Sequence, residues 1–184
     1  MFTEYHTNED MLEKTIERSR KKVIAKYRHN GKGIVTGPHN PASVGCNMYV
    51  LEGGESATVF TLNPWHQGHE MLGHGGITAA ILDEVMGYSN HAREYVKGLK
   101  YTPVFTGTVT YAYIKPVKVG VQYYATAKIF KIEGRLRHIR GVIFDQDGNC
   151  YVRGEGVFIT APSIEDKDEM VAFQPLTDND PKEI

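Results

Sequence analysis

The pattern of apolar residues is the feature that most limits which fold this chain can adopt. In one segment apolar residues repeat with the period of a helix, and in the four segments that follow they repeat with the period of a strand. In residues 75–92, the apolar side chains Ile77, Ile81 and Val85 recur every four positions, which is typical of one face of a helix. Four long runs rich in β-branched and aromatic residues follow it, separated by turn signals such as an Asp-Gly dipeptide. These runs cover residues 104–115, 121–132, 135–146 and 150–160. One helix against a long antiparallel sheet predicts an α+β fold.

Two further elements are predicted before this helix. Residues 46–52 and 55–62 alternate with the period of a strand on either side of a Gly-Gly connection, which indicates a hairpin. In residues 8–30, apolar side chains that include Val23 and Tyr27 recur at multiples of about one helical turn. We therefore expect an added N-terminal amphipathic helix in front of the hairpin.

The length of 184 residues favours one domain with two extensions, because a domain takes roughly 150 residues. We place the domain at residues 44–161, with an N-terminal helix and loop at residues 1–43. The tail at residues 162–184 is polar and acidic, so we expect loose or peripheral structure there rather than core.

The charge of the chain is nearly balanced, with 21 Lys plus Arg against 22 Asp plus Glu and a net charge of -1. This balance removes the electrostatic reason to expect nucleic acid or an anionic membrane as the main partner. No apolar run approaches the roughly 18 residues of a membrane span, and the chain does not open on a secretory leader. We therefore expect a cytoplasmic protein.

The start of the predicted central helix carries His74, Gly75 and Gly76 in a row. Two glycines let another molecule approach the backbone, and the first-turn amides are free donors at the positive end of the helix dipole. Such an arrangement has the features of an oxyanion hole, a site where backbone amides stabilise a negatively charged oxygen. The alternative is that the glycines only permit a tight turn. His74 fits two roles, either ordering that turn or carrying a proton.

Asp83 is the acidic residue that suits a reaction at this helix. It follows Gly75 by eight residues, which is roughly 12 Å along the helix and 80° around it. A base or nucleophile acts within about 3 Å of its target, so one substrate carbonyl cannot contact both residues. If both belong to one site, they come from two chains, as a two-fold dimer provides. The alternative for Asp83 is a solvent-facing helix residue.

The helical wheel divides the remaining residues of this helix between two faces. Asp83, Met86 and Asn90 fall opposite Ile77, which directs them away from the sheet. Glu84 falls on the apolar face, where an ionised carboxylate needs a partner. We interpret Glu84 as a structural carboxylate.

No metal site is predicted from the His and Cys residues. His66, His69 and His74 are spaced by three and five positions, which matches no helical ligand pair. Cys46 and Cys150 lie far apart in the sequence and form no CxxC pair, so two free thiols are expected.

The chain resembles the hotdog-fold thioesterases of the PaaI-type (THEM-like) acyl-CoA thioesterase superfamily in two segments, HQGHEMLGHGGITAAILDEVMG and VFTGTVTYAYIKPVKVG. The shared features are an HGG at the start of the central helix, an acidic residue nine positions after the His, and a strand that ends in a Pro-containing turn. The resemblance covers residues 44–161 and implies a hotdog fold, in which a long antiparallel sheet wraps around a central helix. It also implies a homodimer paired into a tetramer.

The resemblance implies a role for each of five residues. Gly75 donates its backbone amide to the thioester carbonyl, and Asp83 of the partner subunit activates water or attacks directly. Thr106 helps to position the water or the acid, and Gln67 lies in the preceding loop near the thioester. His74 completes this catalytic set.

We further expect five positions to bind the substrate. They are Gly76, Gly68, Met86, Arg135 and Arg137. Arg135 and Arg137, together with Arg140, Lys115 and Lys118, are the candidates for the phosphates of coenzyme A.

The leading hypothesis is therefore an acyl-CoA thioesterase that needs no cofactor, because coenzyme A arrives as part of the substrate. Two alternatives remain open. One is a non-catalytic hotdog protein that binds or senses acyl-CoA or fatty acids. The other is a hotdog dehydratase acting on hydroxyacyl or enoyl thioesters, for which the position of the acidic residue is less suitable.

Overall fold

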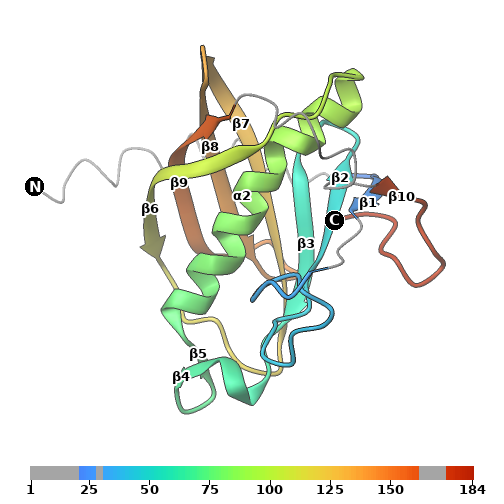
Figure 1. Ribbon diagram of the computed structural model, residues 1–184. Coiled ribbons are helices and arrows are strands. Elements are labelled where there is room, and N and C mark those ends of the chain that lie inside the picture. Colours follow the sequence, from blue (N-terminus) through green and yellow to red (C-terminus); the bar gives the residue numbers. More distant parts are fainter. Residues whose placement is uncertain (1–20, 28–30, 162–172) are drawn as a thin grey trace, which may run out of the picture.

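The computed structural model describes residues 21–27, 31–161 and 173–184. Within these ranges one long helix, α2 (Gly75–Lys97), crosses one face of an eight-stranded antiparallel sheet (Figure 1). The strands of this sheet are β1 (Val23–Tyr27), β2 (Asn47–Leu51), β3 (Ser56–Thr61), β6 (Val104–Tyr113), β7 (Gln122–Glu133), β8 (Leu136–Phe144), β9 (Cys150–Thr160) and β10 (Phe173–Gln174). Their order across the sheet is β10-β1-β2-β3-β7-β8-β9-β6. The predicted α+β arrangement, a long antiparallel sheet around a central helix, is confirmed.

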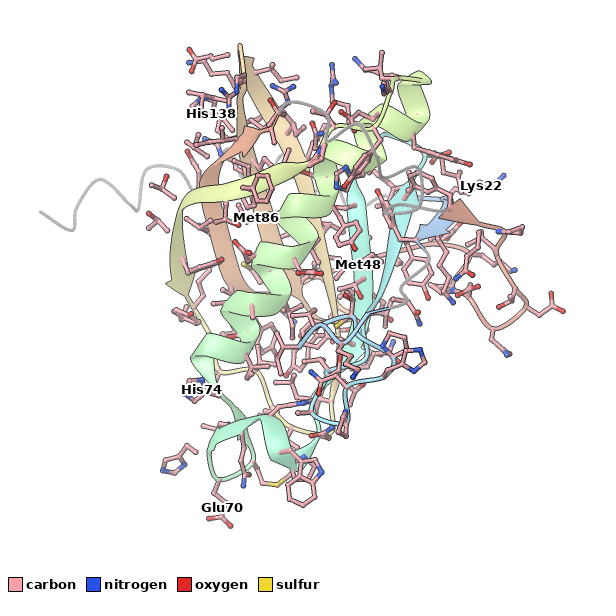
Figure 2. All side chains as sticks on the ribbon, viewed as in Figure 1. Lys22, Met48, Glu70, His74, Met86 and His138 are labelled. Atoms are coloured by element: carbon pink, nitrogen blue, oxygen red, sulfur yellow. The ribbon has the colours of Figure 1, made fainter. Side chains whose placement is uncertain are left out.

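A short connection leads from β3 to the helix. It contains a 3-10 turn, η1 (Pro64–His66), and a small hairpin of β4 (Gln67–His69) and β5 (Leu72–Gly73). This hairpin lies at the N-terminal end of α2, next to His74 (Figure 2). None of the helices in the described ranges combines the length and the apolar character that crossing a membrane requires.

The core lies where α2 meets the sheet, and glycines on two strands allow the close approach. A Cβ atom added at Gly141 would lie 2.9 Å from Leu82 Cδ1 and 2.9 Å from Met86 Cγ. A Cβ atom at Gly154 would lie 3.0 Å from Met86 Sδ. Met86, at the middle of α2 (Figure 2), has no exposed surface. The prediction that Met86 faces away from the sheet is wrong, because the sheet curves around the helix and buries more than one face of it.

The second half of the predicted N-terminal helix is instead the strand β1. Val23, Ala25 and Tyr27 are buried and alternate with half-buried residues. Val23 and Tyr27 are four positions apart, and this spacing fits two strand repeats as well as one helical turn. The apolar pair alone therefore could not separate the two structures. The rest of the predicted helix, residues 8–20 and 28–30, lies outside the described residues.

The described part of the C-terminal tail, residues 173–184, packs on the sheet rather than lying loose. Strand β10 pairs with β1 in an antiparallel register, and Ile184 is only 8% exposed. This segment is therefore ordered but lies at the edge of the sheet, which fits the peripheral alternative of the expectation rather than the loose one, and residues 162–172 lie outside the described ones. The boundaries 44–161 stay a prediction, while β1 and β10 extend the sheet from outside them.

A buried carboxylate anchors this segment. Asp180 accepts hydrogen bonds from Lys26 Nζ at 2.9 Å and from the Tyr49 hydroxyl at 3.0 Å. Its second oxygen accepts from the backbone amide and the hydroxyl of Thr177, both at 2.8 Å. These donors stabilise the ionised form and hold the pKa of Asp180 well below its usual range.

Asp180→Asn is expected to lower the free energy of unfolding by about 3 kcal/mol at neutral pH, because it leaves Lys26, whose side chain is only 16% exposed, without its charge partner. Since the folded-state pKa of Asp180 is depressed, its stabilising contribution is present above the ordinary Asp pKa of about 3.9 and is lost as the pH falls below it. The difference between the two proteins should shrink in that acidic range. Urea denaturation across pH measures it. Asp178→Asn, at an exposed neighbouring carboxylate, is the matched control, and equal losses in both variants would contradict the assignment.

Candidate active site

The start of α2 is ordered by His74, which occupies the N-cap position. Its Nδ1 accepts a hydrogen bond from the Gly76 amide at 2.9 Å, and its own amide donates to His66 O at 2.8 Å. The next amide, that of Gly75, has no acceptor among the described residues. A free N–H group at the positive end of a helix dipole is suited to hold a developing negative charge on oxygen.

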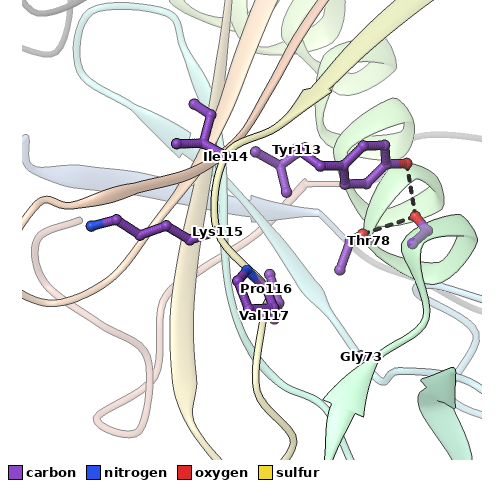
Figure 3. A pocket seen from close by; sticks show the side chains of 9 residues that line it. Gly73, Thr78, Tyr113, Ile114, Lys115, Pro116 and Val117 are labelled. Carbon is purple, nitrogen blue, oxygen red and sulfur yellow. Dashed lines mark hydrogen bonds between the residues drawn. The ribbon is translucent and has the colours of Figure 1, made fainter. Parts of the chain in front are cut away.

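A cleft of about 240 Å³ opens beside Gly75 (Figure 3). The residues that line it are Gly73, Gly75, Thr78, Tyr113, Ile114, Lys115, Pro116, Val117 and Val152. The carbonyl of Gly75 accepts hydrogen bonds from the hydroxyl groups of Thr78 at 2.8 Å and Tyr113 at 3.0 Å. The Tyr113 bond fixes the helix start against the end of β6, while the Thr78 bond lies within α2. Neither residue was singled out from the sequence as part of this site.

Asp83 lies two turns further along α2 and pairs with β6. The Thr106 hydroxyl donates to the two carboxylate oxygens of Asp83, at 3.1 and 3.2 Å. Burial raises the pKa of Asp83 above the usual range, and the hydrogen bond from Thr106 opposes that rise. The structure thus brings together two of the residues that the resemblance implied.

A second cleft, of about 190 Å³, surrounds this carboxylate between α2 and the start of β6. The residues that line it are Asp83, Glu84, Gly87, Tyr88, His91, Val104, Thr106 and Phe158. Glu84 accepts a hydrogen bond from the Thr36 hydroxyl at 3.2 Å, which supplies the partner expected for a structural carboxylate. Burial raises the pKa of Glu84, the bond from Thr36 lowers it, and the neighbouring charge of Asp83 raises it further.

Gly75 and Asp83 therefore line two different clefts of the same chain. The two clefts flank opposite ends of β6, because one contains Tyr113 and the other contains Val104 and Thr106. This separation agrees with the helix geometry, which places the two groups roughly 12 Å apart along the axis.

Gln67 and Gly68 lie on the β4–β5 side of the helix start, and neither lines either of the two clefts described above. Gln67 is exposed, and its Oε1 accepts a hydrogen bond from the Met71 amide at 3.4 Å. A Cβ atom at Gly68 would lie 3.0 Å from His74 Cα, so the loop packs tightly on the cap residue. Gly76 is exposed and makes the cap bond described above.

The two arginines proposed to bind substrate are occupied within the fold. Arg135 Nε donates to Thr160 O at 3.0 Å, and Arg137 Nε donates to Asn90 Oδ1 at 3.1 Å. Neither arginine lines the Gly75 cleft or the Asp83 cleft. Lys115 is the candidate cation that the structure places at the cleft beside Gly75, where it is exposed.

The His and Cys residues do not gather into a metal-binding group in the described part of the chain. The ring of His66 is buried, with Nε2 3.2 Å from Ala42 O. Cys46 and Cys150 are free thiols, as expected.

Comparisons with known proteins identify solved structures that share this architecture. No family model matches the chain, and no curated protein matches it. Among solved structures, a thioesterase superfamily protein is similar with a TM-score of 0.61 and 25% identity, over 85% of this chain and 75% of that chain. The Escherichia coli PaaI protein, from the phenylacetic acid degradation operon, has a TM-score of 0.57 and 14% identity, over 65% and 81%. A Streptococcus mutans UA159 protein bound to acetyl-CoA has a TM-score of 0.52 and 11% identity, over 59% and 82%.

The chain thus shares the hotdog fold of the similar thioesterase superfamily protein and of the PaaI protein. This confirms the resemblance to these proteins that the HGG and the following strand indicated.

Proposed function

We propose that this protein hydrolyses an acyl-CoA thioester to a carboxylate and free coenzyme A. The observation that carries the proposal is the half-buried Asp83, held by Thr106 in a cleft beside the central helix. A carboxylate in such a cleft can serve as a general base or a nucleophile. The acetyl-CoA bound to the similar Streptococcus mutans protein supports the choice of ligand. Coenzyme A enters as part of the substrate, and the proposal requires no cofactor.

The proposal needs a second copy of the chain, and β6 offers the surface for it. This ten-residue strand ends the sheet, so one row of its backbone groups is unpaired in the described structure. Phe105 and Tyr113 on it are 59% and 54% exposed. Long exposed edge strands with apolar side chains favour pairing with another chain. We expect a homodimer joined through β6, and its further pairing into a tetramer stays a prediction.

Antiparallel pairing of two β6 strands about a two-fold axis sets the start of one strand opposite the end of the other. The Asp83 cleft lies at the start of β6 and the Gly75 cleft at its end. In such a dimer each Gly75 cleft faces the partner's Asp83 cleft. Two composite sites result, each with one amide donor and one carboxylate.

The chemistry at such a site needs only these groups and water. The Gly75 amide hydrogen-bonds the thioester oxygen, and the partner's Asp83 removes a proton from water or attacks the carbonyl carbon itself. In the first route the water oxygen bonds to the carbonyl carbon, the C–S bond breaks, and the thiolate of coenzyme A takes up the proton. In the second route the carboxylate oxygen bonds to the carbonyl carbon and the C–S bond breaks to give a mixed anhydride and the thiolate. Water then hydrolyses the anhydride to the product acid and the Asp83 carboxylate, and the thiolate takes up a proton from that water. Lys115 lines the Gly75 cleft, and its ammonium group lies 5.7 Å from the centroid of the Tyr151 ring, so it is our candidate to bind a phosphate of coenzyme A.

A thiol-release assay with a panel of acyl-CoA thioesters tests the proposed function. We expect turnover above the rate of spontaneous hydrolysis for at least one acyl group. If the folded protein releases no thiol from any of these thioesters, the proposal that it is a thioesterase is wrong. Tight binding of the same ligands in calorimetry would then favour the non-catalytic acyl-CoA binding protein.

Mixing two inactive variants tests whether the site is shared. Asp83→Asn removes the carboxylate, and Gly75→Pro removes the amide hydrogen. Random exchange of subunits gives half mixed dimers, each with one intact composite site, so about a quarter of the wild-type activity should return. Each variant alone, taken through the same exchange, is the control. Activity that stays at the level of the single variants would place both groups in one chain's own site and exclude the shared arrangement.

Thr106→Val should shift the pH profile of the reaction. Asp83 acts when ionised, so kcat/KM falls as the pH drops through its pKa, which burial already raises. The Val side chain removes the hydrogen bond that lowers this pKa, and the acidic limb should move to higher pH. Thr106→Ser keeps the hydroxyl and should keep the wild-type profile. An unchanged limb in the Val variant would show that another group controls it.

A further inference from the structure

Two hydroxyl groups hold the carbonyl of Gly75 at the edge of its cleft. The hydroxyl of Tyr113 donates to this carbonyl at 3.0 Å and that of Thr78 at 2.8 Å (Figure 3). Thr78 is itself part of α2, so its bond moves with the helix and cannot hold the helix against the sheet. Tyr113 is the last residue of β6, and its bond therefore connects the first residue of the helix to the sheet.

The backbone at the helix start has unusual freedom. His74, Gly75 and Gly76 are all exposed, and the two glycines have no side chain that could pack on the sheet. Glycine has more backbone freedom than any other residue, and the ends of helices fray. The N–H and C=O groups of Gly75 are joined through one Cα atom with two soft dihedral angles. A bond that holds the carbonyl therefore also restricts the direction of the amide.

The ring of Tyr113 packs against the same glycine. A Cβ atom added at Gly75 would lie 3.6 Å from Cε1 of this ring and 3.8 Å from its hydroxyl oxygen. The backbone of Tyr113 is anchored in turn, because it pairs with Val152 of β9, whose side chain has no exposed surface. A donor on a strand that is anchored in the core fixes a position more precisely than a donor on a loop.

Strand β6 also holds the carboxylate of the proposed site. Near its start Thr106 donates to Asp83, and at its end Tyr113 donates to Gly75. In a dimer paired through β6, the start of one strand lies opposite the end of the other. The amide of one copy and the carboxylate of its partner are thus both positioned by the two strands that form the interface.

We propose that Tyr113 is a positioning residue, whose hydroxyl holds the Gly75 carbonyl and thereby orients the Gly75 amide toward the thioester oxygen. The inference rests on the proposed function, because it takes Gly75 as the donor to the developing oxyanion. Tyr113 acts through Gly75 and contacts no reacting atom. Stabilisation of an oxyanion depends steeply on the geometry of the donor, and a misplacement of about 1 Å can cost about a hundredfold in rate.

Tyr113→Phe tests the role of the hydroxyl, since it keeps the ring and removes the hydrogen-bond donor. We expect kcat to fall about tenfold and KM to stay within about twofold of the wild type, because the lost restraint matters most in the transition state. Tyr95→Phe, at a tyrosine 42% exposed near the other end of α2 and outside both clefts, is the matched control and should keep the wild-type kinetics. An unchanged kcat in Tyr113→Phe, or a loss confined to KM, would overturn the proposal.

The oligomeric state must be measured in the same samples, because Tyr113 lies on the strand that we expect to join the two copies. Sedimentation velocity should give the same mass for Tyr113→Phe as for the wild type. A loss of activity that appears only when the variant dissociates would assign the effect to the interface and overturn the positioning role.

A double-mutant cycle tests whether Tyr113 acts through the Gly75 amide. Gly75→Pro removes the amide hydrogen, so no donor remains for Tyr113 to orient. Adding Tyr113→Phe to Gly75→Pro should therefore lower kcat by less than about twofold, whereas independent effects would multiply. A further loss of about tenfold in the double variant would show that Tyr113 acts by another route, and the proposal would be wrong.

Hydrogen exchange tests the same contact without any turnover. The amides of Ile77 and Thr78 donate to the His74 carbonyl in the first turn, so their exchange rates report how often the helix start opens. They should exchange about two- to tenfold faster in Tyr113→Phe, the factor that one hydrogen bond supports, and at wild-type rates in Tyr95→Phe. Unchanged exchange in Tyr113→Phe would contradict the restraint by the hydroxyl.

Failure of this inference is distinguishable from failure of the proposed function. Equal turnover by the wild type and Tyr113→Phe leaves the thioesterase in place and excludes the positioning role. Absence of hydrolysis by the wild type with every acyl-CoA contradicts the thioesterase, and hydrogen exchange then decides whether Tyr113 positions the helix start. Faster exchange in the variant supports that role, and unchanged exchange overturns it.

Discussion

Asp83→Asn is expected to lower kcat for thioester hydrolysis by about a thousandfold, the effect of losing a general base or a nucleophile. The amide keeps the size of the carboxylate, so the cleft and the hydrogen bond to Thr106 have room to remain. Steady-state thiol release measures the loss, and calorimetry with the same acyl-CoA should find binding retained.

The same variant should be no less stable than the wild type at neutral pH. Burial raises the pKa of Asp83, so keeping this group ionised in the folded state costs free energy at every pH above its unfolded value. Asparagine removes that cost. Asp147→Asn, on the exposed turn between β8 and β9, is the matched control and should keep full activity. Full activity of Asp83→Asn itself would remove this residue from the mechanism.

Gly75→Pro is expected to lower kcat by about a hundredfold, because it deletes one hydrogen-bond donor to the developing oxyanion. The helix itself should tolerate proline, which is favoured at the first helical position. The preceding residue, His74, has φ -64° and ψ 130°, the extended conformation that a residue before proline prefers. Thermal unfolding should therefore remain close to that of the wild type while turnover is lost.

Gly75→Ala is the control for this substitution, since it adds a Cβ atom but keeps the amide hydrogen. That Cβ atom would lie 3.6 Å from Tyr113 Cε1, an ordinary van der Waals contact. The alanine variant should retain most of the activity. If both variants lose activity equally, space beside Tyr113 matters rather than the amide, and the oxyanion role of Gly75 is wrong.

The central helix, the first hairpin and the four long strands were predictable because each has a repeat of one clear period. The strand β1 was not, because two apolar residues four positions apart satisfy both periods. Residues 173–184 were not either, because their composition is polar. Their one buried carboxylate, Asp180, is neutralised by Lys26, which is distant in sequence.

The candidate site likewise has features that could be predicted from the sequence and features that could not. The cap at His74 and the spacing of Asp83 follow from local geometry, and the resemblance indicated Thr106. The engagement of Arg137 by Asn90 depends on how the end of the helix meets β8, for which no local pattern exists.

The two-residue strand β10 has a consequence for how these molecules associate. At one end of the described sheet, β10 covers β1 with only two paired positions and exposes few backbone groups of its own. A template for continued lateral growth needs a long unpaired strand on both sides. Among the described strands only β6 forms such a side, so two copies joined there, as proposed, would leave no long edge of these strands to recruit a third, which would oppose fibre formation by this route.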